Sequence, residues 1–343
     1  MRKHLWKIAL AAIVVVLAAV ASVGWWGYRQ LAGSLPQLDG ELTAGGLSAP
    51  VTIDRDQLGI PTIRAGNRLD LAYATGFVHA QDRFFQMDLL RRSSAGELAE
   101  LAGAGALELD RRNRVHRFRQ VARRLLEASG DEDRALLETY AKGVNAGLAS
   151  LRVKPFEYLL LGGTPAPWKA EDCALCLFSM YLALQGEDFR DETRLGLMHD
   201  LLPEPVFEFL APLGTEWDAP IEGEAFVVAP IPGPDVFDTR QEGAIDRDLL
   251  APSGTSPAKG PVHRGSNNWA VSGRHTADGR ALVANDMHLD IRVPHIWYRA
   301  SLVWADGEKM ERRITGVTLP GTPAVIVGSN GHIAWGFTNS EGD

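Results

Sequence analysis

A chain of 343 residues is long enough for two or three domains with a sizeable hydrophobic core. Its 43 acidic and 35 basic residues give a formal net charge of −8. This acidic balance argues against a nucleic-acid partner, because proteins that bind phosphate backbones usually carry a surplus of lysine and arginine.

The first 31 residues combine a basic start with a long apolar run. Arg2, Lys3 and Lys7 precede "IALAAIVVVLAAVASVGWW", which is at the short end of the roughly 17–25 residues that cross a bilayer. The basic residues predict a cytoplasmic N-terminus. An Ala-Val-Ala step at 19–21 also fits a signal-peptide cleavage site. A signal anchor and a cleaved signal peptide therefore both stay open, and each predicts export of the rest of the chain.

After the N-terminal segment, the spacing of the apolar residues changes from that of strands to that of helices. "VTIDRDQLGIPTIRA" alternates apolar and polar residues around Gly59 and Pro61, which indicates a strand, a turn and a second strand. From Asn67 the apolar residues recur at steps of three and four, which predicts a helix ending near Gly103. Further helical patterns follow at about 115–150 and 168–202.

The two cysteines, Cys173 and Cys176, lie within one of these helical patterns. A redox pair or half of a zinc site is one interpretation of this spacing, but no second pair accompanies it. We favour small core residues one helical turn apart. The redox alternative predicts a disulfide between the two.

Residues 204–264 are rich in Pro, Gly and Asp with little period, which predicts a long loop and linker. Beyond Ser266 come short β-rich runs parted by turn sequences such as "ADGR" and "SNGH", which predict an antiparallel sheet. The change of character falls abruptly at the Gly265–Ser266 step.

Ser266 has no conventional base nearby in sequence. It is in neither a GxSxG nor a SxxK motif. Cleavage of the bond before it would free its own α-amine, whose pKa of about 7.7–8.0 makes it a usable base near neutral pH. Gly265 would tolerate the strained backbone that this cleavage needs. The alternative is an ordinary Gly-Ser turn before a strand.

Several long motifs resemble the N-terminal part of a penicillin acylase precursor, of the penicillin amidase family in the N-terminal-nucleophile hydrolase superfamily. They are "IDRDQLGIPTIRA", "GFVHAQDRFFQMDLLRR", "GSNNWAVSG", "ADGRALVANDMHL" and "GVTLPGTPAVIVGSNGHIAWGFTN", in that order. The resemblance implies an α+β fold: an αββα sandwich, incomplete here, with a largely helical α-subunit region.

The same resemblance implies how the precursor is divided. Residues 1–31 would be the anchor or signal, 36–244 the α-subunit-like region, 245–265 a spacer, and 266–343 the start of the β subunit. Cleavage between Gly265 and Ser266 would yield an α/β heterodimer.

Site residues follow from the matching motifs. Ser266 would be the nucleophile, His288 would lie beside its hydroxyl and amine, and the backbone N–H of Asn339 would contribute to the oxyanion hole. For His288 the alternative is a hydrogen-bonded core histidine. The resemblance implies a second oxyanion donor beyond residue 343, so a fragment of this length would lack part of the site.

The family also implies a structural calcium ion and no organic cofactor. Glu192, with Asp191 as the alternative, and Asp343 match its carboxylate ligands. Because calcium takes six to eight oxygen ligands, two carboxylates can equally belong to a solvated acidic cluster.

The resemblance therefore implies a hydrolase of linear amides, exported to the periplasmic side and held at the inner membrane by its N-terminal segment. Acylated β-lactams, acyl-homoserine lactones and acyl-peptides are the candidate substrates. The alternative is a truncated, non-catalytic exported fragment, or a subunit that needs the missing half in trans.

Overall fold

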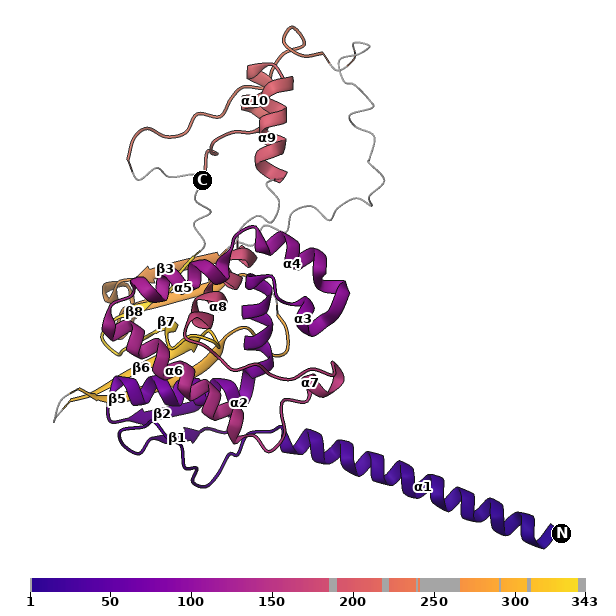
Figure 1. Ribbon diagram of the computed structural model, residues 1–343. Helices are drawn as coiled ribbons and strands as arrows, with labels where there is room; N and C mark the ends of the chain where they lie inside the picture. The colour runs from indigo at the N-terminus through magenta and orange to yellow at the C-terminus, as the bar shows by residue number, and fades with distance from the viewer. Residues whose placement is uncertain are drawn as a thin grey trace. The chain divides into compact units, whose positions relative to one another are not determined.

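The computed structural model describes residues 2–184, 190–217, 222–238, 240, 266–289, 291–306 and 310–338. The chain forms two compact units (Figure 1). The first contains residues 1–184 and 265–343, and the second contains residues 185–264. The predicted spacer, 245–265, lies outside the described residues.

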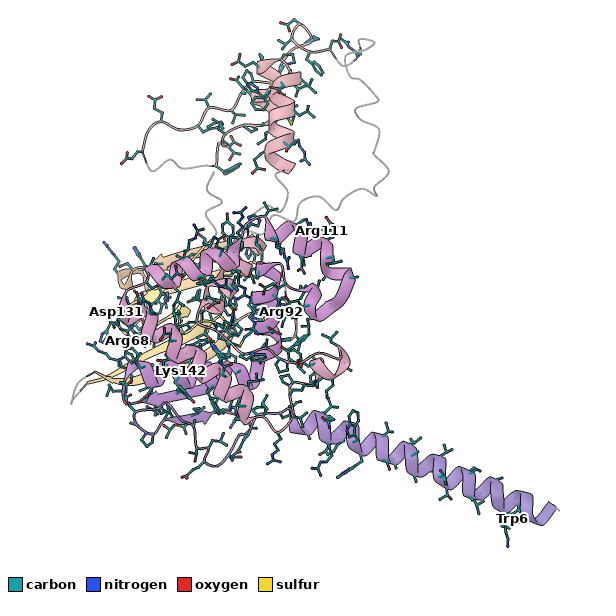
Figure 2. All side chains as sticks on the ribbon, in the orientation of Figure 1. Trp6, Arg68, Arg92, Arg111, Asp131 and Lys142 are labelled. Carbon is teal, nitrogen blue, oxygen red and sulfur yellow. The ribbon has the colours of Figure 1, made fainter. Side chains whose placement is uncertain are left out.

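Helices make up most of the first unit before residue 184. They are α1 (Arg2–Gly33), α2 (Arg68–Ala95), α3 (Ala99–Ala102), α4 (Leu107–Arg114), α5 (Phe118–Ala128), α6 (Asp131–Ser150), α7 (Glu157–Leu160) and α8 (Glu171–Leu184), with a short 3₁₀ turn, η1 (Gly103–Ala106). In α1 the stretch Ala9–Gly33 has a mean hydropathy of 2.3 and none of it is buried. In Figure 2 α1 extends away from the rest of the first unit, and Trp6 near its start is exposed. Its length and composition suit a bilayer span, although a signal sequence meets the same criteria.

The central helix of the first unit is α2, which contacts α6, α8, β2 and β5. Asn67 caps its N-terminus by accepting a hydrogen bond from the backbone of Asp70, 2.9 Å away. The helix ends at Ala95 rather than near Gly103, because Gly96 takes a left-handed conformation (φ 67°) and closes the last turn. The helical pattern beyond it belongs to α3 and η1.

Close approach of α2 and α6 depends on glycine. A Cβ at Gly76 would collide with the backbone of Tyr140, and one at Gly143 or Gly147 would collide with the backbone of α2. Side chains from both helices fill the core around this contact, including Phe84, Met87, Tyr140 and Val144.

The predicted strands all form, but in two sheets instead of one. The first is ordered β1 (Thr52–Arg55), β2 (Pro61–Ala65), β5 (Tyr298–Asp306), β6 (Met310–Thr318), β7 (Val325–Ser329) and β8 (Ala334–Trp335). Its pairs are antiparallel except β2–β5, which is parallel. The second sheet is a hairpin of β3 (Ser266–Val271) and β4 (Leu282–Met287), joined through η2 (Gly273–His275). The mixed α+β class is confirmed.

The cysteine pair belongs to the core. Cys173 and Cys176 are free, buried thiols in α8. Cys176 packs against Gly321, which has a φ of 111° and no room for a Cβ. Burial raises the pKa of Cys173 to about 12. The core interpretation is confirmed, and the redox alternative, which required a disulfide, is wrong.

The second unit contains α9 (Arg190–Leu201) and α10 (Glu204–Leu210). A loop was expected from residue 204, so α10 corrects that prediction. It begins after Pro203, which is compatible with a helix start, and it is only seven residues long, too short for a period to be recognised.

Candidate active site

Ser266 is the first residue of β3, as the abrupt change of sequence pattern predicts. It is half-buried and pairs with Met287 of β4 in antiparallel register. Successive side chains on a strand point to opposite faces. Because Asn285 lies two residues before Met287, its side chain shares a face with that of Ser266.

His288 lies on the other face of the hairpin. Its Nε2 is 3.1 Å from a carboxylate oxygen of Asp286 and 3.4 Å from the Asn267 side-chain amide. Asn267 and Asp286 are paired in the register, opposite to the face of Ser266. Among the hydrogen bonds of the described residues, none joins His288 to Ser266. Any role for the imidazole beside the serine therefore requires a rearrangement of this strand end.

Asn285 connects the hairpin to the chain that leads to Asn339. Its Nδ2 donates to the carbonyl of Phe337 at 2.9 Å, and the backbone N–H of Phe337 donates to its Oδ1 at 3.3 Å. The same Nδ2 lies 3.1 Å from the carbonyl oxygen of Asn267. A Cβ on Gly336 would be 2.8 Å from Asn285 Cβ, so this close approach requires glycine.

The sequence analysis did not assign a role to Asn285, although the residue lies within the "NDMHL" motif that contains His288. Its partners are backbone groups 18 and 52 residues away, so no local pattern marks it. The contact brings Phe337, two residues before Asn339, against the hairpin that begins with Ser266. Asn339 itself lies outside the described residues, as does Gly265.

The predicted calcium ligands are only partly described. Glu192 is an exposed residue of α9, and Asp343 lies outside the described residues. Within the described ranges, no group of three or more His, Cys, Asp or Glu side chains is placed to hold a metal ion. One exposed carboxylate cannot supply the six to eight oxygens that calcium takes. The calcium site stays a prediction.

A chain of buried hydrogen bonds links residues from both sides of the predicted cleavage point. The backbone N–H of Gly321 donates to the hydroxyl of Tyr140 at 3.0 Å, and this hydroxyl lies 2.7 Å from Nδ1 of His79. Nε2 of His79 lies 2.9 Å from Oγ1 of Thr318, which donates to the carbonyl of Tyr298 at 3.0 Å.

These directions assign the tautomer of His79. Because the Thr318 hydroxyl already donates elsewhere, it accepts from Nε2–H, and Nδ1 accepts from Tyr140. Burial lowers the pKa of His79 to about 3, with a smaller contribution from the nearby charge of Arg83. The imidazole is therefore neutral at physiological pH. We assign His79 a structural role, because both of its ring nitrogens form hydrogen bonds with buried side chains of the protein.

A second link across the predicted cleavage point is ionic. Arg55 donates to both carboxylate oxygens of Asp82, at 2.8 and 3.1 Å. The hydroxyl of Tyr298 donates to the same carboxylate at 2.5 Å. Burial, reinforced by the charge of Asp82, raises the pKa of Tyr298 well above its usual value. Tyr298 thus stays protonated and ties β5 to α2.

Comparison with known proteins agrees with these motifs. The penicillin amidase family matches residues 50–343. The chain is 36% identical over 318 residues to penicillin acylase 2 proenzyme of Pseudomonas sp. (strain SE83), covering 90% of this chain and 39% of that protein. It is 32% identical over 335 residues to acyl-homoserine lactone acylase QuiP of Pseudomonas aeruginosa, covering 97% of this chain and 38% of that protein.

Among solved structures, a thermostable penicillin G acylase from Alcaligenes faecalis is similar, with a TM-score of 0.44 and 26% identity over 54% of this chain and 98% of that chain. The chain spans about two fifths of the length of the curated relatives named above. Since the family match covers most of the chain, the protein belongs to the penicillin amidase family.

Proposed function

We propose that this chain is part of a self-cleaving precursor of an amide hydrolase whose nucleophile is Ser266. The observation that carries the proposal is the position of Ser266 as the first residue of β3, in a family whose members named here are acylases. Free of its upstream neighbour, this residue would carry a hydroxyl and an amine on adjacent atoms.

The maturation step is an acyl shift followed by hydrolysis. Ser266 Oγ attacks the carbonyl carbon of Gly265, and the C–N bond of the peptide breaks as the amine takes a proton. The resulting ester joins Gly265 to the hydroxyl of Ser266. Water hydrolyses this ester, which leaves a carboxylate on Gly265 and a free α-amine on Ser266.

In turnover the neutral amine removes the proton from Ser266 Oγ as the oxygen attacks the substrate carbonyl. The backbone N–H of Asn339 would stabilise the negative charge that develops on the carbonyl oxygen. The protonated amine then gives its proton to the leaving amine, and an acyl-enzyme remains. Water, deprotonated by the same amine, hydrolyses the acyl-enzyme and releases a carboxylic acid.

Asn285 supports this scheme as a positioning residue. It shares a face with Ser266 and holds Phe337 two residues before Asn339. This contact would keep the oxyanion donor in register with the nucleophile. His288 contributes to the scheme only if its ring leaves Asp286 after cleavage.

For substrates, we propose linear N-acyl amides, including acylated β-lactams, acyl-homoserine lactones and acyl-peptides. The relatives named as penicillin acylase and acyl-homoserine lactone acylase support this class. The mature protein would be an α/β heterodimer on the periplasmic side, attached through α1. A calcium ion is proposed on family grounds alone, and no step above uses it.

The hairpin itself favours one alternative, in which further protein is required for activity. Trp269 and Leu282 are exposed on one face of the hairpin and Val283 is exposed on the other, and Phe337 is exposed as well. Exposed apolar residues on both faces of a two-stranded sheet indicate that additional protein covers the hairpin in the active state. That protein could belong to the same precursor or be supplied in trans.

Intact-mass measurement tests the proposal. Wild-type protein should yield a new N-terminus at Ser266, and Ser266→Ala should remain whole. Ser272→Ala, an exposed serine just after β3, is the matched control and should be cleaved like the wild type. Persistent cleavage in Ser266→Ala would overturn the assignment. The assignment would also be overturned by a folded wild-type chain that stays whole both alone and after addition of a protein that supplies the remaining part of the precursor in trans.

A further inference from the structure

Three apolar side chains in α7 and at its two ends face solvent. Leu160 is 80% exposed, Leu161 46% and Phe156 40%. The segment is nevertheless firmly held, because Tyr158 is fully buried and its hydroxyl donates to Asp88 at 2.6 Å. One side of α7 is thus fixed to the core, and its other side presents an apolar surface.

The segment that leads into α7 contacts the end of α1, and Figure 1 shows α7 in the same region of the first unit as this helix end. The backbone N–H of Val153 donates to the carbonyl of Gly33, the last residue of α1, at 3.0 Å. A Cβ on Gly33 would lie 2.6 Å from Val153 Cγ2, so the helix end and the segment before α7 are packed together. The candidate span therefore ends against the segment that leads into the exposed apolar residues.

The residues around this junction have the composition of a membrane interface. Trp25, Trp26 and Tyr28 are exposed in the last turns of α1, where aromatic residues commonly sit at headgroup level. Arg152 is exposed on the other side of the junction. Aromatic, aliphatic and basic side chains together favour the boundary between lipid headgroups and acyl chains.

We propose that residues 152–161 form a membrane-contact segment that lies in the phospholipid interface where α1 leaves the bilayer. Phe156, Leu160 and Leu161 enter the upper acyl-chain region, and Arg152 meets lipid phosphate. This contact would fix the orientation of the first unit on the membrane surface. The proposal depends on retention of α1 and is independent of the proposed amidase activity.

A fluorescent label on a single new cysteine tests this contact. The native thiols Cys173 and Cys176 are buried, which allows selective labelling of Leu160→Cys with an environment-sensitive dye in the folded full chain. The protein is reconstituted into vesicles of phosphatidylethanolamine and phosphatidylglycerol, with and without lipids that carry a quencher near the headgroup. Val115→Cys is the matched control, because Val115 is 77% exposed and lies between Arg114 and Arg117.

The label at position 160 should shift to shorter wavelength and lose most of its fluorescence to the lipid quencher, whereas the label at 115 should do neither. Equal quenching at both positions would indicate general electrostatic adsorption and overturn the proposal. A label at position 160 that stays exposed to water would also overturn the proposal. A label that is shielded from water but is not quenched by lipid would overturn it as well, because protein would then cover the site. The proposal would also be overturned if the mature chain proved to have lost α1 by processing, because the contact depends on retention of α1.

Discussion

Asn285 and Phe337 form a closed pair of hydrogen bonds in which one side-chain amide satisfies both backbone groups of a residue 52 positions away. This arrangement imitates a β-bridge between the hairpin and the segment after β8. It is the contact in the described residues that joins the start of the proposed β subunit to the chain leading to the predicted oxyanion donor.

Replacement Asn285→Ala should therefore loosen the segment that follows β8. Loss of the amide removes both hydrogen bonds to Phe337 and a third to the carbonyl of Asn267, each worth about 0.5–1.5 kcal/mol. We expect hydrogen exchange of the Phe337 amide to accelerate by about tenfold or more, since local opening becomes easier. Peptide-resolved exchange measured by mass spectrometry checks this.

Asn145→Ala is the control for that experiment. Asn145 makes a similar pair of bonds to the backbone of Trp168, with its Nδ2 2.8 Å from the carbonyl oxygen and its Oδ1 2.8 Å from the backbone nitrogen. Its loss should speed exchange near Trp168 and leave Phe337 unchanged. If both variants accelerate exchange at Phe337 equally, the effect is global and the local role of Asn285 is refuted.

The neutral buried imidazole of His79 predicts a pH-dependent stability. Its pKa is about 3 in the folded protein against an ordinary value of 6.5, so the unfolded chain binds a proton that the folded chain does not between these limits. Stability is then fully present above pH 6.5 and falls as the pH is lowered toward 3, by up to about 1.4 kcal/mol per pH unit.

Urea unfolding in detergent between pH 7 and pH 5 measures this slope. His79→Gln should reduce the slope of unfolding free energy against pH by the amount that one bound proton contributes. His332→Gln, at an exposed position in the turn before β8, is the control and should have the slope of the wild type. An unchanged slope in His79→Gln would show that the imidazole is not the group responsible.

The hydroxyl of Tyr140 should matter more than a typical buried hydroxyl. It is fully buried, and its removal in Tyr140→Phe leaves both His79 Nδ1 and the Gly321 N–H without their partner. Each unsatisfied buried group costs about 1–3 kcal/mol. Tyr73→Phe breaks a single bond to the carbonyl of Gly45, which is itself exposed, and should cost less. Equal unfolding free energies for the two variants would contradict the assignment of the network.

Local chemistry accounts for what the sequence could predict. The Asn67 side chain accepts a hydrogen bond that caps the start of α2, and Gly96, which lacks a Cβ, takes the left-handed conformation that ends it. Both are recognised sequence signals, although Gly96 was overlooked within a longer apolar pattern. The start of β3 at Ser266 was likewise visible from the change of residue composition alone. The family motifs then supplied the predicted roles of the site residues, which spacing alone does not indicate.

Contacts between distant residues account for what was missed. The parallel pairing of Thr62 with Ser301 joins strands separated by most of the chain, so alternation within each strand carries no information about it. The face on which the His288 side chain lies also depends on strand register, which a motif does not specify. The role of His288 beside Ser266 stays a prediction.

The contact between α2 and α6 offers the sharpest test of the fold. Gly143 has no space for a Cβ, because the backbone of Tyr73 occupies that position. Gly143→Ala must therefore separate the helices or distort them, and overpacking of this kind typically costs about 1–3 kcal/mol or more. Gly196 lies within α9 with nothing within 4 Å of its Cβ position. There the same substitution should be neutral or stabilising by up to about 1 kcal/mol, since alanine favours the helix. Thermal or urea unfolding of the two variants compares these outcomes directly. A Gly143→Ala protein as stable as the wild type would mean that the helices do not pack through their backbones, and the core built around Tyr140 would have to be redrawn.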